Sequence, residues 1–350
     1  MREEPKTVIS LGATGLSLNL MSQMRAIQVS ELGGPEVLKR VFLPVPEPAP
    51  GEVLLEIEAA GVNFADILWV RGGYLEQVAL PFVPGMEAVG RASKLGEGVS
   101  GIGVGQRYAV LHSLGGFAEY SAAPADHLVP IPDQLSDLEA AAFPISYYTA
   151  YFALKEMAHF EPGEWVLIEA AAGALGTALI QLANLEGLNV IAAASTPEKL
   201  ALAQRLGARG LINYREEDLP VRVQSISSGH GLDGVFETVG GPNLQKNLEA
   251  MAEFGRMVFI GNASGEFPRI NPFYLMSKNL TFSAMWLSRL MQYPERVKRA
   301  GAYLAERVAR DHVRPVVGAV FDLEAASEAF NTVLERKNLG KVIIKIKADL

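Results

Sequence analysis

The 350-residue chain contains no cysteine. It therefore cannot form a disulfide framework, a thiolate nucleophile or a cysteine-ligated metal site. The absence fits a reducing compartment, and we expect a cytoplasmic protein. The histidines are few and scattered, without the spacing of metal ligands, so we also expect no metal site. They are His112, His127, His159, His230 and His312.

The chain also lacks a run of basic residues and a long apolar stretch. Its formal net charge is −8, so electrostatics give no support to a nucleic acid or a membrane surface as a partner. No segment reaches the roughly 18 uninterrupted apolar residues of a membrane span. The nearest, residues 140–154, is shorter and contains Pro144. With 49% hydrophobic and 20% charged residues, the chain has the composition of a globular protein.

The most informative stretch is 166–176, in which an apolar run of strand length meets an alanine- and glycine-rich turn. Residues 177–186 follow with helical spacing, so the order is strand, loop and helix. In the dinucleotide-binding pattern G-x-G-x-x-G, the last two glycines are Gly173 and Gly176 and an alanine takes the first position. Small residues there let the backbone and the helix start approach a pyrophosphate. The predicted contacts are Ala171, Gly173, Ala174, Leu175 and Gly176. An ordinary strand–helix junction would also explain this turn.

The next strand, 189–194, ends without the acidic residue that bonds the ribose 2′-hydroxyl in most NAD-binding folds. Ala194 takes that position, where an acid would repel a 2′-phosphate. Hydroxyl groups and a cation follow, and a phenol ends the third strand at the same edge. The residues concerned are Ser195, Thr196, Lys199 and Tyr214. Together they predict NADPH as the cofactor, although Lys199 and Tyr214 alone also fit a solvated helix residue and a half-buried strand end.

The pattern of predicted secondary structure changes near residue 136. Before it, short extended segments are broken by glycine and proline, which predicts a β-rich, barrel-like region. After it, strands alternate with helices, which predicts a doubly wound parallel sheet and an α/β fold class. Residues 1–23 read as an N-terminal extension, which we expect to be disordered, because a strand pattern starts at Met24.

Four motifs occur in order along the chain: Gly61–Asp66, Pro84–Gly90, Ala170–Gly176 and Asn213–Asp218. Together they resemble the medium-chain dehydrogenase/reductase superfamily and, within it, the zinc-independent quinone oxidoreductases. The resemblance covers residues 24–346. It implies a GroES-like catalytic domain at 24–145 and 284–350, with a Rossmann NADPH-binding domain inserted at 146–283. The active site would be the cleft between the two domains.

The resemblance also bears on metal and on the site. Zinc-dependent relatives have a cysteine where this chain has Asn63, a histidine where it has Met86 and a further cysteine near Ile145. Their second, structural zinc site needs four cysteines. The resemblance therefore implies that both zinc sites are absent from this chain. It implies a catalytic role for Asn63, near the nicotinamide ribose and the substrate carbonyl, and for Tyr74, near the substrate. Cofactor contacts carried over by position are Asn63, Thr149, Gly240, Gly261, Asn262, Asn338 and Lys341.

Each of these assignments has a structural alternative. Asn63 also fits a residue that caps its own turn, and Thr149 fits a helix residue that bonds its own backbone. Tyr74 also fits an aromatic wall that only stacks on the substrate.

The sequence therefore predicts an NADPH-dependent, zinc-free oxidoreductase that reduces a quinone or an activated enone. The alternatives are an enoyl-thioester or alkenal reductase, and an NADPH-binding protein with little catalysis. We also expect a homodimer, because residues 281–286 read as an apolar strand whose exposed edge would pair, as in the family. That strand could instead be covered by the chain's own C-terminal helices.

Overall fold

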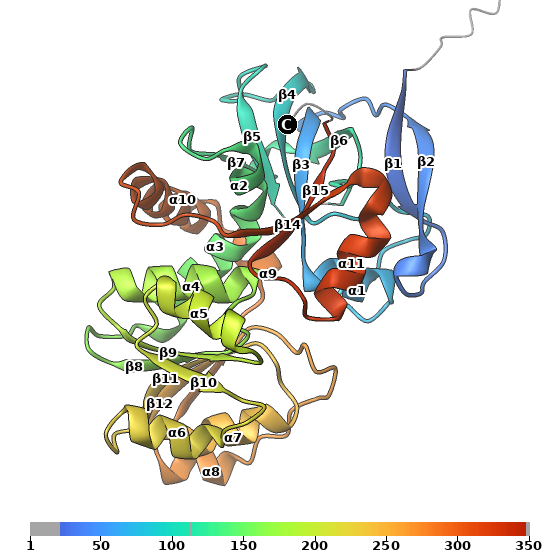
Figure 1. The fold of residues 1–350 in the computed structure, drawn as a ribbon. Coiled ribbons are helices and arrows are strands. Elements are labelled where there is room, and N and C mark those ends of the chain that lie inside the picture. Colours follow the sequence, from blue (N-terminus) through green and yellow to red (C-terminus); the bar gives the residue numbers. More distant parts are fainter. Residues whose placement is uncertain (1–21, 112–113, 348–350) are drawn as a thin grey trace, which may run out of the picture.

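A computed structural model describes residues 22–111 and 114–347. The first strand begins at Gln23, and residues 1–21 of the predicted extension lie outside the described residues. Figure 1 shows two lobes, of which the upper one contains both the first and the last parts of the chain.

The lower lobe is built on a six-stranded parallel sheet with the strand order β10-β9-β8-β11-β12-β13. This is the order of a Rossmann fold, and it reverses between β8 and β11, where the crevice for a ligand opens. The strands are β8 (Trp165–Ile168), β9 (Asn189–Ala194), β10 (Gly210–Asn213), β11 (Leu232–Glu237), β12 (Met251–Phe259) and β13 (Thr281–Ala284). The predicted doubly wound sheet is confirmed.

Helices cover both faces of this sheet (Figure 1). Because side chains alternate along a strand, Val166 and Ile168 pack into the core that contains α4, whereas Leu167 packs with residues of α6 and α7. All three are fully buried, which explains the continuous apolar run in the sequence. The helices are α4 (Ala174–Leu185), α5 (Pro197–Arg205), α6 (Leu219–Ile226), α7 (Pro242–Ala250) and α8 (Pro272–Ser277).

The upper lobe contains a seven-stranded sheet in the order β14-β15-β3-β4-β5-β7, with β6 also paired to β3. β15, near the end of the chain, pairs antiparallel with β3, so the C-terminal segment completes the N-terminal sheet as the resemblance implied. The strands are β3 (Glu52–Val62), β4 (Glu87–Leu95), β5 (Arg107–Leu111), β6 (Tyr120–Pro124), β7 (Leu128–Pro130), β14 (Val317–Asp322) and β15 (Lys341–Lys345). The mixed fold class, a GroES-like part and a Rossmann part, is confirmed.

The remaining elements are a two-stranded hairpin, further helices and short 3₁₀ turns. A hairpin of β1 (Gln23–Val29) and β2 (Leu38–Pro44) flanks the upper sheet. The remaining helices are α1 (Phe64–Val70), α2 (Asp137–Ala142), α3 (Pro144–Tyr151), α9 (Leu287–Met291), α10 (Pro294–Ala309) and α11 (Ala326–Leu334). Short 3₁₀ turns occur at Pro35–Val37, Ala125–His127 and Leu323–Ala325.

Some elements differ from the sequence-based expectation. The sequence pattern predicts a helix over residues 148–157, but the helix starts earlier, because Pro144 occupies its first turn, where a proline loses no hydrogen bond. It then continues as a π-helix over Phe152–Ala158. The strands β2 and β14 were not expected.

No helix in the described parts of the chain is both long and apolar enough to cross a bilayer.

Candidate active site

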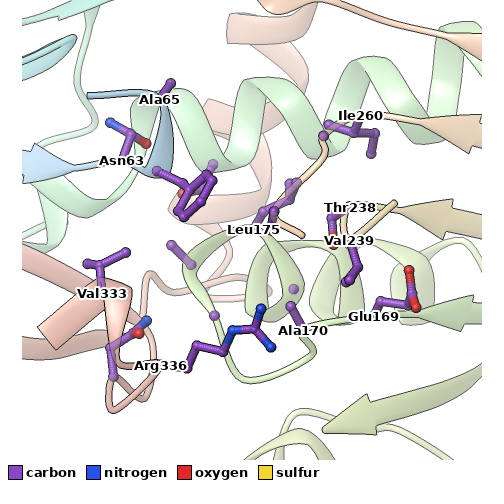
Figure 2. A pocket seen from close by; sticks show the side chains of 18 of the residues that line it. Asn63, Ala65, Glu169, Ala170, Leu175, Thr238, Val239, Ile260, Val333 and Arg336 are labelled. Atoms are coloured by element: carbon purple, nitrogen blue, oxygen red, sulfur yellow. The ribbon is translucent and has the colours of Figure 1, made fainter. Parts of the chain in front are cut away.

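A cavity of about 730 Å³ lies where the two lobes meet. Its wall combines the carboxyl ends of the parallel strands with α1, the segment before β4 and the segment that leads into β15. In Figure 2, Asn63 and Arg336 face this space from the upper lobe, and Glu169, Ala170 and Leu175 face it from the lower lobe. The cavity is therefore the crevice that the reversal of strand order opens.

The glycine-rich loop forms the floor of the cavity between β8 and α4. Gly173 precedes the helix, and its N–H donates to the carbonyl of Ala170 at 2.8 Å. A Cβ atom on Gly176 would lie 2.5 Å from the Ala170 oxygen and 2.7 Å from the Ala171 Cα, so only glycine fits. Ala174, Leu175 and Gly176 line the cavity, and the N–H groups of a first helical turn have no partner within the helix. The start of α4 therefore presents N–H groups that suit an anion.

Two cations and a phenol gather beside the end of β9. The ammonium of Lys199 donates to the backbone oxygen of Arg336 at 2.5 Å, and Tyr214 and Ser195 line the same part of the cavity. Burial lowers the pKa of Lys199 below its ordinary value of 10.5. In Figure 2, the guanidinium of Arg336 extends toward the loop at Ala170. This cluster suits a second, more exposed anionic group.

The segment that leads into β15 is tied to the glycine-rich loop. The N–H of Gly340 donates to the carbonyl of Ala172 at 2.7 Å. Gly340 has a φ of 87°, and a Cβ there would lie 2.3 Å from the oxygen of Val316, so this approach requires glycine. The amide of Asn338 donates to the Gly340 oxygen at 2.9 Å. Arg336 and Lys341 are thereby placed at different ends of one cavity.

At the far end of the cavity, three polar side chains form a closed group. The ammonium of Lys341 donates to Asn63 Oδ1 at 2.7 Å and forms an ion pair with Glu87 Oε1. Asn63 Nδ2 donates to the same glutamate oxygen at 2.9 Å, and Glu87 Oε2 accepts from the backbone N–H of Ile145 at 2.7 Å. Lys341 is 2% exposed and Glu87 is 1% exposed. Asn63 thus bonds side chains distant in sequence.

Asp66 fixes the backbone around this group. Its carboxylate accepts from the N–H of Asn63 at 2.8 Å and from the N–H of Met86 at 2.9 Å. Burial raises the pKa of Asp66 to about 6, although both backbone bonds favour the charged form. Asp66 therefore holds the start of α1 against the segment before β4.

Tyr74 closes the far end of the cavity. Its hydroxyl oxygen accepts a hydrogen bond from Trp286 Nε1 at 2.9 Å, and it stands edge-on to that ring and to Trp69. Burial raises the pKa of Tyr74 above its ordinary value of 10.0, while bonds with Trp286 and Ser288 oppose the rise. Tyr74 therefore remains protonated at neutral pH.

Comparisons with known proteins agree with this arrangement. The family model described as alcohol dehydrogenase GroES-like domain matches residues 49–133, and the model described as zinc-binding dehydrogenase matches residues 174–302. A quinone oxidoreductase-like protein 2 homolog from Nematostella vectensis is 37% identical over 327 residues, which cover 92% of this chain and 89% of the relative.

The chain belongs to the quinone oxidoreductase family of the medium-chain dehydrogenases/reductases. A solved quinone oxidoreductase from Thermus thermophilus is 45% identical with a TM-score of 0.81, covering 92% of this chain and 100% of that one. The quinone oxidoreductase from Escherichia coli is 30% identical with a TM-score of 0.88, covering 92% and 99%. Both studies describe complexes with NADPH.

Most residues predicted for the site in this family member lie together. Those that line the cavity are Asn63, Tyr74, Thr149, Gly173, Ala174, Leu175, Gly176, Ser195, Lys199, Tyr214, Gly261, Asn262, Asn338 and Lys341. Their binding roles stay predictions.

Three predicted contacts do not line the cavity. Ala171 is fully buried beneath the loop, with its N–H bonded to the Ala193 oxygen. The hydroxyl of Thr196 caps α5 by accepting from the N–H of Lys199 at 3.3 Å. The N–H of Gly240 donates to Glu237 Oε1 at 2.8 Å, which turns it toward the core.

The positions that carry zinc ligands in related enzymes meet at the far end of the cavity. Asn63, Met86 and Ile145 all line it, and they offer one amide oxygen, one thioether and one aliphatic side chain. No cluster of three or more histidine, cysteine, aspartate or glutamate side chains suited to a metal occurs within residues 22–111 and 114–347. His112 lies outside those ranges.

A pair of buried carboxyl groups at the carboxyl ends of β8 and β11 was not predicted. Glu169 and Glu237 stand at the ends of β8 and β11, and Glu237 Oε1 accepts from the N–H groups of Val239 and Gly240 at 2.8 Å each. Burial raises the pKa of Glu169 well above its ordinary value of 4.5, and the charge of Glu237 raises it further. Glu169 is therefore the protonated member of the pair.

Among the other cavity residues, Asn243, Trp286 and Arg336 were also missed as site residues. So was Glu87, which lies behind the cavity wall and contacts Asn63 and Lys341. Glu87 lies within a motif that supported the family resemblance, and Arg336 stands two residues before Asn338. Their proximity to recognised positions was the available signal, because their partners lie far away in sequence.

Proposed function

We propose that this protein is an NADPH-dependent, zinc-free oxidoreductase that reduces a quinone or an activated enone by hydride transfer. One observation carries the proposal: a single cavity runs from the cations Lys199 and Arg336, past the glycine-rich loop, to the buried group around Asn63 and Lys341. Relatives at 30% identity or more that share this fold have been crystallised with NADPH.

The residues present fit NADPH in three places. Gly176 lets α4 pack closely on the backbone of Ala170 and Ala171, so that the start of the helix faces the cavity where a pyrophosphate would lie. Lys199, Arg336 and Tyr214 surround the position next to β9 where a 2′-phosphate would stand, and Ala194 puts no negative charge there. Thr238, Val239 and Asn243 line another part of the cavity in the lower lobe, where the adenosine of NADPH would lie.

Bound NADPH supplies a hydride, and the residues of the chain prepare the acceptor for it. The reduced acceptor gains negative charge on an oxygen atom, and hydrogen-bond donors in a water-poor cavity stabilise that charge. Tyr74, which lines the cavity and whose hydroxyl is bonded by Trp286 and Ser288, is one such donor. Met86, Ile145 and Leu287 provide apolar walls that hold the acceptor and limit water.

The test is NADPH consumption, followed at the nicotinamide absorbance, against a panel of quinones, enals, enones and enoyl thioesters. We expect turnover with quinones or enones and slower turnover with NADH. Faster reduction of enoyl thioesters than of every quinone and enone would favour a thioester reductase. Tight NADPH binding without turnover on any acceptor would favour a binding protein.

We also propose a homodimer formed through β13. This strand ends the six-stranded sheet, and its edge would pair with a second copy. Phe273 is 77% exposed and Met276 is 68% exposed on the neighbouring α8, so apolar surface lies near that edge. Mass measurement in solution at micromolar concentration checks this, and a monomer would contradict it.

We propose that activity requires no zinc and takes place in the cytoplasm. The far end of the cavity, around Asn63, Met86, Ile145 and Lys341, is the acceptor end. Its lining offers no thiolate or imidazole, and the sequence contains no cysteine. Elemental analysis of the purified protein is the test. Stoichiometric zinc that leaves together with activity on chelation would contradict the proposal.

A further inference from the structure

We propose that Lys341 is a catalytic residue that donates a charged hydrogen bond to the acceptor oxygen, and that Asn63 and Glu87 position its ammonium. The inference deepens the proposed function and rests on it. It differs from the sequence-based expectation, in which Asn63 has the catalytic role near the substrate carbonyl and Lys341 contacts the cofactor.

The hydrogen bonds of Asn63 leave it no free donor. Its amide nitrogen has two N–H groups, which reach Glu87 Oε1 at 2.9 Å and the backbone oxygen of Gly61 at 3.4 Å. Its amide oxygen accepts from Lys341. Asn63 is therefore a positioning residue, whose oxygen orients the neighbouring cation.

Lys341, in contrast, keeps one donor. An ammonium has three N–H groups, and the contacts of Lys341 Nζ are with Asn63 Oδ1 and Glu87 Oε1. No third acceptor contacts it among the residues that the structure describes. Lys341 lines the cavity although it is only 2% exposed, so the remaining N–H is available to a molecule bound there.

The backbone around the ion pair is shaped to accommodate it. A Cβ on Gly61 of β3 would lie 2.6 Å from the Lys341 Cε, 2.6 Å from Glu87 Oε1 and 2.7 Å from the Ala141 oxygen. Glycine at this position therefore makes room for both side chains. The second oxygen of Glu87 is held by the N–H of Ile145, so the pair cannot easily turn away.

The location of this cation matches the chemistry required. Asn63, Met86 and Ile145, which replace the zinc ligands of related enzymes, line the same end of the cavity. During reduction the acceptor takes up a hydride and then a proton, which comes from water for a quinone and from Tyr74 for an enone, and between these events its oxygen carries negative charge. A fixed ammonium stabilises that charge far better in a buried site than in water. In the resting protein, the carboxylate of Glu87 balances the positive charge of Lys341.

The test compares Lys341→Met, a neutral side chain of similar length, with Lys341→Met/Glu87→Gln, which leaves no unpaired charge. Lys345→Met on the same strand, outside the cavity lining, is the matched control. For each protein we would measure kcat at saturating NADPH and acceptor, the Kd of NADPH by fluorescence titration, and the melting temperature.

We expect Lys341→Met to lower kcat by roughly 10²–10³, the loss typical of one oxyanion donor. The Kd of NADPH should stay within about threefold of the unmodified protein. The double variant should regain melting temperature, because it removes the lone buried carboxylate, but not kcat. Lys345→Met should leave kcat within about threefold.

Recovery of kcat in the double variant would show that the ion pair is only structural and would overturn the proposal. A Kd for NADPH that rises as much as kcat/KM falls would overturn it too, in favour of a cofactor contact. If the unmodified protein turned over no acceptor, the proposed function would fail and this inference with it. Turnover that is normal in both the unmodified protein and Lys341→Met would remove this inference alone.

Discussion

The two ends of the cavity hold their cations in opposite ways. At the cofactor end, Lys199 is half-buried and Arg336 is exposed, and no ion pair joins either one to an acid among the described residues. At the acceptor end, Lys341 is buried and paired with Glu87. Cations that no acid pairs suit a ligand that arrives charged, whereas a buried, paired cation suits a neutral ligand that becomes charged during the reaction.

The largest effect that would sharpen this contrast comes from Tyr74→Phe. In the proposed reaction its hydroxyl would supply a proton to a reduced enone, whereas a reduced quinone would take its proton from water. We expect enone reduction to slow by roughly 10²–10⁴, the usual value of general acid catalysis, and quinone reduction to slow far less. NADPH affinity should not change. Rates within about twofold for both acceptor classes would leave Tyr74 as a wall residue.

Lys199→Ala tests the cofactor end. Because a hydrogen bond to a charged group contributes about 1.5–3 kcal/mol, NADPH affinity should fall about tenfold or more. NADH, which lacks the phosphate, should bind almost as before. Titrations with both cofactors check this. The control is Lys337→Ala, because Lys337 is a neighbouring cation that already pairs with Glu335. Equal losses for NADPH and NADH would refute the assignment of Lys199.

Gly61→Ala tests whether the acceptor end depends on its tight packing. The added methyl group would overlap Glu87, Lys341 and the Ala141 oxygen, so we expect a loss of about 1–3 kcal/mol in the free energy of unfolding, together with a lower kcat. Gly73→Ala is the control, because the nearest atom to its Cβ is 4.0 Å away. Unchanged stability and unchanged kcat in Gly61→Ala would mean that the ion pair tolerates displacement.

The smallest effect concerns the carboxyl pair at the carboxyl ends of β8 and β11. The folded-state pKa of Glu169 is raised, so its contribution to stability is present below pH 4.5 and is lost as pH rises through the raised pKa. Glu169→Gln stays neutral, so it should be increasingly more stable than the unmodified protein as pH rises. Urea unfolding at about pH 5 and about pH 9 measures this, with the exposed Glu253→Gln as control. A difference that does not vary with pH would contradict the assignment.

The two ends also differ in how far the sequence predicted them. The glycine-rich loop, Ser195, Lys199 and Tyr214 follow directly on buried strands, so local pattern places them at one sheet edge, and the structure brings them together. The Rossmann sheet was predictable for the same reason.

The acceptor end was predicted only in part, because its bonds join residues far apart in sequence. Lys341 Nζ and Asn63 Oδ1 belong to residues separated by 278 positions, and no local pattern indicates that they meet. Trp286 bonds Tyr74 over 212 positions. The pairing of β15 with β3, which decides these contacts, came from the family resemblance and not from periodicity.

The contrast between the two ends is tested most directly by measuring the Kd of NADPH and kcat at saturating cofactor for Lys199→Ala and Lys341→Met side by side. We expect Lys199→Ala to raise Kd about tenfold with kcat within about threefold, and Lys341→Met to show the reverse, a large loss of kcat with Kd within about threefold. If both variants changed Kd and kcat by similar factors, the separation of cofactor binding from acceptor activation would be wrong.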